Sequence, residues 1–431
     1  MTPRITMKYA KGGDEHMAYM ARILGVWVVT RALLLLCVLR VLTAPGPDVT
    51  SDVSVIYQGW YEILRTGTFP LDDVTWQYPP AAALAVLSPA LLPFLGYACA
   101  FFVLALLADA AVCGLLLYTG RRPGKSLRGL WVWLVGVPLL GPTVYARYDV
   151  MVTAVAVAAL LAGARHPRTM GALAGFGALL KVWPVLLLVG VPRGRATLRS
   201  WTAAACTALG ATLAFLAAMP GALAFLTFQR DRGTEVESLG ALVFHVGRHL
   251  GWRGEVRLNY GSVEFLGPYV PLVSTAAQAL SAAAFCWLLV WRLRARAWSA
   301  STLADAAFVA VLLFTATSRV ISPQYMLWLV GGAAVCLAFR TSRMEVPARL
   351  VLAATFVTFL EFPVWFSHVV ASDPLGVALL VVRNGLLVAA ALLACRNLWR
   401  QTVSEPRGRA RQPVPEQVSQ APSADTYASA P

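Results

Sequence analysis

Long apolar runs recur along the chain, separated by short polar segments. A helix needs about 20 apolar residues to cross ~30 Å of hydrocarbon. On this criterion we place spans over residues 21–43, 95–119, 129–145, 149–164, 170–191, 200–225, 269–292, 299–318, 321–340, 347–370 and 375–395. The run 170–191 is interrupted at Lys181-Val182-Trp183-Pro184, which predicts two half-helices that enter the membrane and return. The pattern therefore predicts an all-α, polytopic integral membrane protein with about 11 or 12 helical segments.

Two long segments, 44–94 and 226–268, lie outside these spans. In the first, apolar and aromatic residues recur with helical spacing: Val53, Ile56, Tyr57, Trp60, Tyr61 and Leu64. Such a face predicts an amphipathic helix that lies on the membrane surface. Ser51 or Asp52 can cap its start, and Gly67 can end it.

A second short helix is predicted after Pro79 and Pro80, because proline suits the first turn of a helix. It runs over residues 81–93 and is too short to span the bilayer. We therefore expect external juxtamembrane helices between the first two spans.

The composition supports a membrane protein and excludes a soluble one. Of the 431 residues, 58% are hydrophobic and 13% are charged, and the mean hydropathy is +0.65. Soluble domains carry roughly 45–50% apolar and about 25% charged residues. The five histidines and seven cysteines lack the spacing of a metal site or a disulfide framework, so we expect neither a metal nor another cofactor.

The chain is strongly basic, with a formal net charge of +15 and a pI near 9.9. In a soluble protein this would suggest nucleic acid, but in a membrane protein cytoplasmic loops carry the excess of Lys and Arg. The basic segments are 121–125, 165–168, 193–195, 292–296 and 340–343. These basic segments can all lie on the cytoplasmic side only if the stretch 170–191 crosses the membrane twice and the stretch 79–94 does not cross it. We therefore expect both termini in the cytoplasm, with a leader over 1–20, a membrane domain over 21–395 and a disordered tail over 396–431.

Four charges fall inside the predicted spans. Arg31 and Asp109 lie at matching depths from the cytoplasmic end of neighbouring spans, and Glu361 and Arg383 lie at matching depths below the external face. Charges inside a membrane are costly unless they pair with each other or serve a function. Equal depth and opposite sign predict two structural ion pairs.

Other charged and polar residues gather at the external span ends and in the external loops. They are Asp48, Asp52, Arg147, Asp149, Lys181, Arg230, Arg232, Glu235, Glu237, Arg319 and Gln324. Broken backbone at membrane depth is tolerated only where it is buried in protein or lines a cavity. Lys181 at its helix break, with Arg147 and Arg319 at the same level, therefore predicts an anion pocket. Phosphate is its natural guest because guanidinium binds it bidentately, although each arginine alone can also snorkel to the interface.

Two carboxylates follow directly after the first span. Asp48 and Asp52 would face the anion pocket, where a carboxylate suits a general base that takes a proton from a hydroxyl group. Each also has a structural interpretation, Asp52 as a helix cap and Asp48 as a turn residue after Pro47. The residues leave the choice between Asp48 and Asp52 open.

Several short motifs occur in order on the predicted external face. They are Ser51–Tyr57, Gly67, Tyr78-Pro79-Pro80, Ser88-Pro89, Arg147-Tyr148-Asp149, Gly175–Pro184, Arg232–Ser238 and Ser322–Tyr325. Together they resemble glycosyltransferase family 87, the bacterial polyprenol-phosphate-mannose-dependent mannosyltransferases of the GT-C superfamily. The resemblance covers roughly residues 20–395 and implies a GT-C-type fold in the plasma membrane with its active site on the external face.

The resemblance also implies a reaction and roles for residues. A hexose, mannose foremost, would pass with inversion from a polyprenol-phosphate donor to an envelope glycolipid or glycan acceptor. Asp52 would be the base, with Asp48 as the alternative. Lys181, Arg147 and Arg319 would stabilise the leaving phosphate. The remaining substrate-binding residues would be Tyr57, Tyr78, Asp149, Arg232, Glu235, Glu237 and Gln324.

Two other functions fit a chain of this kind. A secondary transporter or flippase would use Glu361 and Arg383 for coupling, but the sequence shows no repeat between its halves and its charges gather at one face, away from the midplane. A structural partner in envelope assembly would not need Asp52. In each case the lipid bilayer is the surrounding partner, and nucleic acid is not expected.

Overall fold

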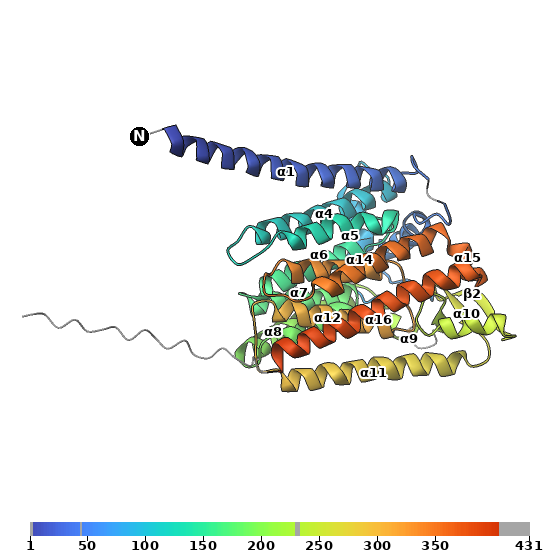
Figure 1. The fold of residues 1–431 in the computed structure, drawn as a ribbon. Coiled ribbons are helices and arrows are strands. Elements are labelled where there is room, and N and C mark those ends of the chain that lie inside the picture. Colours follow the sequence, from blue (N-terminus) through green and yellow to red (C-terminus); the bar gives the residue numbers. More distant parts are fainter. Residues whose placement is uncertain (1–2, 44, 229–232, 405–431) are drawn as a thin grey trace, which may run out of the picture.

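The computed structural model describes residues 3–43, 45–228 and 233–404. The helices run roughly side by side, with α1 along one edge and α11 along another (Figure 1). The α-helices are α1 (Pro3–Val38), α2 (Gln58–Leu64), α3 (Ala82–Leu87), α4 (Tyr97–Gly120), α5 (Arg128–Leu139), α6 (Asp149–Gly163), α7 (Pro167–Leu180), α8 (Arg195–Ala218), α9 (Phe225–Phe228), α10 (Leu242–His249), α11 (Val270–Arg294), α12 (Thr302–Thr317), α13 (Tyr325–Leu337), α14 (Glu345–Phe359), α15 (Phe366–Ala371) and α16 (Pro374–Thr402). The tighter and wider helical turns are η1 (Asp52–Tyr57), η2 (Ser88–Leu91), η3 (Gly141–Val144), η4 (Trp183–Gly190) and η5 (Leu360–Val364).

The predicted spans are found as helices, and they divide into two classes. Within the part of the chain that the structure describes, six helical segments are long and apolar enough to cross a membrane: Met17–Val38, Tyr97–Gly120, Arg195–Ala218, Val270–Arg294, Glu345–Val364 and Pro374–Thr402. Shorter apolar helices such as α12 and α13 are almost wholly buried among them. By contrast, α8 and α11 bury few of their residues. The chain is therefore an all-α polytopic membrane protein whose short inner helices are covered by longer outer ones.

The predicted break at Lys181 is present. The helix α7 ends at Leu180, Lys181 is extended (φ −159°, ψ 137°), and the 3₁₀-helix η4 follows from Trp183. At about 1.5 Å per residue in α7 and about 2.0 Å in η4, neither arm is long enough to cross ~30 Å of hydrocarbon. Both arms are therefore half-helices of one hairpin, with Lys181 at its tip.

The basic segments meet at one end of the bundle, as the charge pattern predicts. Hydrogen bonds of 2.7–2.9 Å join Arg340 to Lys125, Arg292 to Val191, Asn397 to Arg343 and Arg296 to Thr402. We call this the basic end. The opposite end carries the loop after α1 and the segment between α8 and α11, and we call it the loop end. The predicted tail over 396–431 begins within α16 and lies beyond residue 404 outside the described residues.

Both predicted ion pairs are present and fully buried. Arg31 Nε lies 2.8 Å from Asp109 Oδ2, and Arg383 lies 2.6 Å from Glu361 Oε1. Asp109 also accepts hydrogen bonds from Trp133 Nε1 at 2.6 Å and from the Tyr145 hydroxyl at 2.8 Å. The depth argument from the sequence is confirmed, and these four charges stabilise helix packing.

The amphipathic segment of the first loop is helical, but its predicted position on the membrane surface is wrong. Its aromatic face is covered by protein. Trp60 packs edge-on against Trp76 at 5.0 Å between ring centroids, and Tyr57 packs against Phe101 of α4 at 5.6 Å. Helical spacing reveals an apolar face but not whether lipid or protein covers it. Gly67 has φ +88° just past the helix, as predicted.

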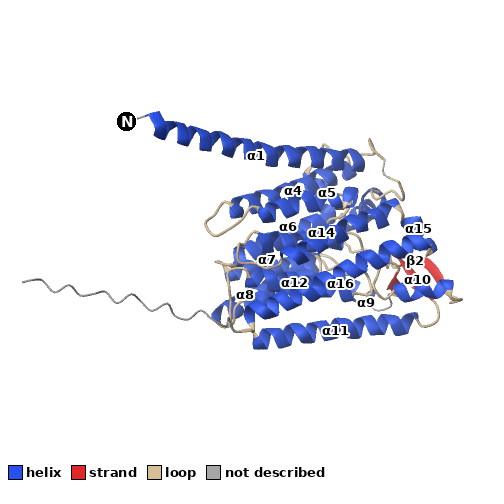
Figure 2. Cartoon of the chain, viewed as in Figure 1, coloured by secondary structure: helices blue, strands red, loops and turns tan. Residues whose placement is uncertain are grey.

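A small antiparallel sheet at the loop end was not expected from the sequence. It consists of β1 (Thr234–Glu235), β2 (Glu255–Asn259) and β3 (Ser262–Leu266), in the order β1-β3-β2. Figure 2 shows these strands confined to one corner beside α10. Tyr260 and Gly261 both have positive φ and form the two-residue turn between β2 and β3. With α10 and α15, the sheet forms a cap with its own cluster of buried apolar residues.

Candidate functional site

Lys181 lies at the tip of the α7–η4 hairpin, and aromatic rings enclose its ammonium group. Its Nζ lies 5.2–5.7 Å from the ring centroids of Tyr78, Tyr148, Tyr325 and Trp328. A cation within about 6 Å of an aromatic face is attracted by the ring. The Lys181 side chain is only 12% exposed, so this aromatic cage holds a largely buried positive charge.

Asp149 provides the negative charge beside this cage. Its Oδ1 lies 2.7 Å from Lys181 Nζ and accepts a hydrogen bond from Trp328 Nε1 at 2.7 Å. Its Oδ2 is buried and has no hydrogen-bond partner among the described residues. Asp149 is the first residue of α6, where the helix dipole favours negative charge. A buried acceptor of this kind is normally satisfied by a ligand or by water.

A second ion pair lies beside the first. Arg147 donates to Asp52 Oδ2 at 2.7 Å, and its Nη1 donates to the carbonyls of Ala146 at 2.8 Å and Val49 at 3.3 Å. The Arg147 side chain is 11% exposed and that of Asp52 is 30% exposed. Asp52 makes no cap for the first loop helix, whose N-cap is Ser51. Its carboxylate therefore pairs with the arginine and stays partly exposed.

Tyrosine rings connect the two pairs. Tyr148 packs against Tyr78 at 5.3 Å and against Tyr57 at 6.0 Å between ring centroids. Burial raises the pKa of Tyr57 well above its usual value, and the nearby charges of Asp52 and Asp149 act in the same direction. The pairs Asp52–Arg147 and Asp149–Lys181 thus lie beside one cluster of aromatic rings, which we call the aromatic cluster.

Asp48 has a different environment. Its Oδ1 accepts hydrogen bonds from the backbone N–H of Thr50 at 2.9 Å and from the Thr50 hydroxyl at 2.6 Å, and its Oδ2 pairs with Arg40. Partial burial alone would raise the pKa of Asp48, but the bonds from Thr50 and the charge of Arg40 outweigh it and lower the pKa. The structure gives Asp48 the contacts of a turn residue.

Arg319 contacts the cap at the loop end. Its Nη1 donates to Ser274 Oγ at 3.1 Å, and its carbonyl accepts the N–H of Glu235 at 3.1 Å. Glu235 in turn accepts a hydrogen bond from the Ser322 hydroxyl at 3.2 Å. Gln324 is 8% exposed and occupies the N-cap position of α13. These contacts place Arg319 with β1 and α11, whereas Arg147 and Lys181 lie beside the aromatic cluster.

Glu237 connects the cap to a buried ion pair. Its carbonyl accepts hydrogen bonds from Arg383 at 2.7 Å and from Asn384 at 3.4 Å. Burial raises the pKa of the Glu237 carboxyl well above its usual value, and the nearby carboxyls of Glu361 and Glu235 add to the shift. Arg230 and Arg232 lie outside the described residues.

The geometry can be compared with known proteins. A family model described as glycosyltransferase family 87 matches residues 76–323, which is more than half of the chain. The chain belongs to glycosyltransferase family 87. No curated protein matches it. This glycosyltransferase is a multi-pass membrane enzyme that needs a sugar donor and an acceptor.

The matched region of this glycosyltransferase contains both residues of the Asp149–Lys181 pair and also Arg147, but Asp52 lies outside it. The link between Asp52 and the matched region is structural, because Asp52 pairs with Arg147 at 2.7 Å. Among the residues that the structure describes, no group of three or more His, Cys, Asp or Glu side chains could hold a metal ion.

Of the four cage residues of the family 87 enzyme, Tyr78 was predicted from the sequence as a site residue, but Tyr148, Tyr325 and Trp328 were not. Trp328 stacks on Tyr325 at 3.9 Å and on Trp183 at 5.2 Å between ring centroids, so three rings form one wall near Lys181. Tyr148 lies in the chain between Arg147 and Asp149, which were both predicted site residues, so its position in the sequence could have identified it as a site residue. Tyr325 and Trp328 are three residues apart at the start of α13 and share one face, as helical spacing requires.

Proposed function

We propose that this glycosyltransferase moves a hexose, mannose foremost, from a polyprenol-phosphate donor to an envelope glycolipid or glycan acceptor. The observation that carries the proposal is the position of the ion pairs Asp52–Arg147 and Asp149–Lys181 beside one cluster of aromatic rings. They combine a carboxylate that is 30% exposed with two cations, of which Lys181 lies at a helix break. This combination suits a phosphate leaving group next to a base.

The carboxylate of Asp52 acts as the general base. It takes the proton of the acceptor hydroxyl as that oxygen bonds to the anomeric carbon of the donor sugar. The bond from the anomeric carbon to the phosphate oxygen breaks, and the polyprenyl phosphate leaves with the electron pair. The configuration at the anomeric carbon is inverted. Asp48 is the alternative base, and its bonds to Thr50 and Arg40 disfavour it.

The cations stabilise the phosphate as its charge increases. Lys181 provides a point charge held by the aromatic cage, and Arg147 provides a planar fork that can bind two phosphate oxygens. Fixed cations of this kind stabilise the transition state without reorganising during the reaction. Arg319 would act from the cap, where it contacts β1 and α11.

The ion pair between Arg147 and Asp52, with 2.7 Å between their side chains, also suggests a sequence of events. A phosphate that binds Arg147 competes with Asp52 for the same N–H donors, because guanidinium recognises both groups through them. Donor binding would thus release the base when the leaving group is in place.

The remaining residues build the walls of the substrate site. Tyr57 and Tyr78 shape the sugar and lipid site together with the aromatic cage. The residues proposed to bind the acceptor or close the loop over it are Asp149, Arg232, Glu235, Glu237 and Gln324. We place the site on the external face of the plasma membrane and both termini in the cytoplasm, because the basic end should face the cytoplasm.

The test is transfer of radiolabelled mannose from polyprenol-phosphate-mannose into an envelope glycolipid fraction. Wild type should transfer label, and both Asp52→Asn and Lys181→Ala should abolish transfer while the protein still folds. Transfer that survives Asp52→Asn but fails in Asp48→Asn would assign the base to Asp48. Failure of folded wild type across a panel of lipid-phosphate sugars would overturn the proposal and favour solute transport.

A further inference from the structure

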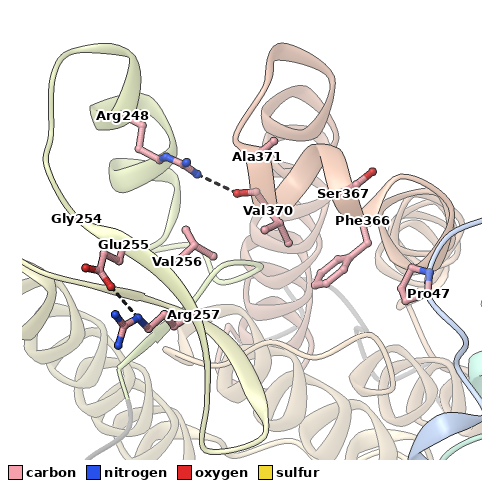
Figure 3. Close-up of a pocket in the computed structure, with 10 residues that line it drawn as sticks. All are labelled: Pro47, Arg248, Gly254, Glu255, Val256, Arg257, Phe366, Ser367, Val370 and Ala371. Carbon is pink, nitrogen blue, oxygen red and sulfur yellow. Dashed lines mark hydrogen bonds and ion pairs between the residues drawn. The ribbon is translucent and has the colours of Figure 1, made fainter.

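A cleft at the loop end, lined by none of the residues of the aromatic cluster, has a volume of about 730 Å³. Its walls come from β2 and the preceding loop on one side and from α15 on the other, with Pro47 at one edge (Figure 3). We propose that it binds sugar units of the acceptor that lie away from the reacting hydroxyl. This inference rests on the proposed function, because it extends the acceptor site.

The lining of the cleft suits carbohydrate. The ring of Phe366 points into the cleft, and Phe362 packs edge-on against it at 5.1 Å between ring centroids. Across the cleft lie Arg257 and Glu255, which form an ion pair with 2.7 Å between Arg257 Nε and Glu255 Oε2. A sugar ring has an apolar face that can pack on an aromatic ring and hydroxyl groups that both donate and accept hydrogen bonds. The two walls provide these partners.

A further cation borders the cleft. Arg248 donates to the carbonyl of Val370 at 2.9 Å and to the Ser372 hydroxyl at 2.9 Å, which fixes its guanidinium at the rim. These bonds join α10 to the end of α15 and hold the two walls together. Ser367 adds a hydroxyl group on the α15 side. The cleft is therefore wide and open, with a few polar groups at its walls and rim, a shape that can hold part of an extended ligand.

The loop after α1 connects the cleft with the candidate base. Pro47 lines the cleft, and Asp52 follows five residues later, so their Cα atoms are at most about 18 Å apart. The loop is held at both ends. A Cβ at Gly46 would lie 1.8 Å from the carbonyl oxygen of Pro363, and the Val49 carbonyl accepts a hydrogen bond from Arg147. An acceptor of a few sugar units can span the distance from Asp52 to the cleft.

The proposal is tested by direct binding to the full-length protein in detergent, without any donor. The probes are linear manno-oligosaccharides of one to five units, and binding is measured by saturation-transfer NMR and by titration. We expect affinity to rise with chain length. Phe366→Ala and Arg257→Ala should each weaken binding of the longest probe by about fivefold to tenfold, as expected for removal of an anchor side chain.

Two variants separate binding from folding. Phe366→Leu keeps an apolar side chain against Phe362 and removes the ring, so it should weaken binding while the fold is retained. Leu258→Ala is the matched control, because Leu258 lies on β2, is 77% exposed and does not line the cleft. It should leave the affinity unchanged.

The kinetics provide an independent measurement. With an acceptor of several sugar units, Phe366→Leu should raise KM and leave kcat near the wild-type value, whereas a single-sugar acceptor should show no change. Equal binding of all probe lengths, wild-type affinity in Phe366→Ala, or no binding of any probe would overturn the proposal. So would capture of an extended peptide on the open edge of β2 in place of sugar.

Binding of oligosaccharides to the cleft can be tested independently of the proposed transfer reaction. Binding of oligosaccharides does not require the donor or the base, so Asp52→Asn should bind them as wild type does. If transfer from the lipid donor fails while length-dependent binding persists, the cleft proposal stands and the donor assignment falls. If transfer succeeds and binding shows no dependence on length, the cleft proposal falls alone.

Discussion

The carboxylate of Asp52 and the guanidinium of Arg147 lie 2.7 Å apart and join the first loop to the segment just before α6. This contact brings together two residues that are far apart in the chain. It also places the candidate base next to a group that can bind phosphate. The predictions for the reaction start from this pair.

Replacement of Asp52 by asparagine should lower the transfer rate by about 10²–10⁴-fold, the usual contribution of a general base. The amide has nearly the same shape as the carboxylate but leaves the guanidinium of Arg147, which is 11% exposed, without its ion-pair partner. Thermal stability should therefore fall, and the rate is expressed per folded molecule. The rate is measured with saturating donor and acceptor. Asp48→Asn is the matched control and should change the rate only a few-fold, and a larger loss in Asp48→Asn than in Asp52→Asn would refute the assignment.

Arg147→Lys should preserve charge but lose the bidentate fork. We expect weaker donor binding and a transfer rate lowered by roughly tenfold or more, because a lysine cannot replace a planar guanidinium at a two-point contact. The measurement is KM for the lipid donor together with kcat. Wild-type kinetics in Arg147→Lys would show that Arg147 does not contact the phosphate.

Asp149→Asn should destabilise the protein as well as reduce transfer. It leaves the ammonium of Lys181, which is 12% exposed, without its ion-pair partner. Removal of one partner from a buried ion pair costs about 3–5 kcal/mol. The variant should therefore unfold at a lower temperature than wild type. The double variant Asp149→Asn with Lys181→Met should recover much of that stability but no activity.

The buried pair Arg31–Asp109 should affect stability without affecting chemistry. Asp109→Ala should cost about 3–5 kcal/mol, because Arg31 would remain buried and unpaired. Replacement of both residues, as Arg31→Met with Asp109→Leu, should recover only part of the loss, because Trp133 and Tyr145 still lose their hydrogen-bond acceptor. The transfer rate per folded molecule should match wild type in each case. A specific loss of activity in the double variant would contradict a purely structural role.

His245 predicts a dependence of stability on pH. Its Nε2 donates to the Val236 carbonyl at 2.8 Å, its Nδ1 lies 2.8 Å from Ser372 Oγ, and burial lowers its pKa to about 4. An unfolded histidine titrates near pH 6.5, so the unfolded chain binds more protons between pH 6.5 and pH 4. Stability from this residue is thus fully present above pH 6.5 and falls as the pH is lowered through 4, by a total on the order of 3 kcal/mol.

The measurement for His245 is the apparent Tm between pH 4 and pH 8. His245→Gln should flatten the decline below pH 6.5. The exposed residue His166 gives the control, since His166→Gln should keep the wild-type profile. An unchanged profile in His245→Gln would show that other groups cause the decline.

Features that follow from the cost of burying charge could be predicted from the sequence. A charge inside a span needs a partner at its own depth, which identifies Arg31 with Asp109 and Glu361 with Arg383. A lysine next to a proline in an apolar run marks a helix break, and Lys181 lies at such a break. These inferences need only distance along the chain and charge.

Features that depend on direction around a helix could not be predicted. Arg319 and Arg147 occur at similar predicted depth, but the structure joins Arg319 to Ser274 and Arg147 to Asp52. The depth of a residue in the membrane does not determine the side of the helix on which it lies. Two residues at the same depth can therefore make different contacts. Trp328 was missed for a related reason, because an aromatic residue in an apolar helix has the same pattern whether it faces the core or a ligand. The short strands β2 and β3 were also missed, because the pattern in most of the chain predicts helices.

The two ion pairs beside the aromatic cluster contribute two positive and two negative formal charges. Their sum is zero, so together they exert little long-range pull on free phosphate ions in the surrounding water. Selection among anions would then depend on the bilayer, which concentrates lipid-linked phosphates in two dimensions. The isoprenoid tail would supply most of the affinity, and the headgroup would enter by displacing a carboxylate from its partner cation.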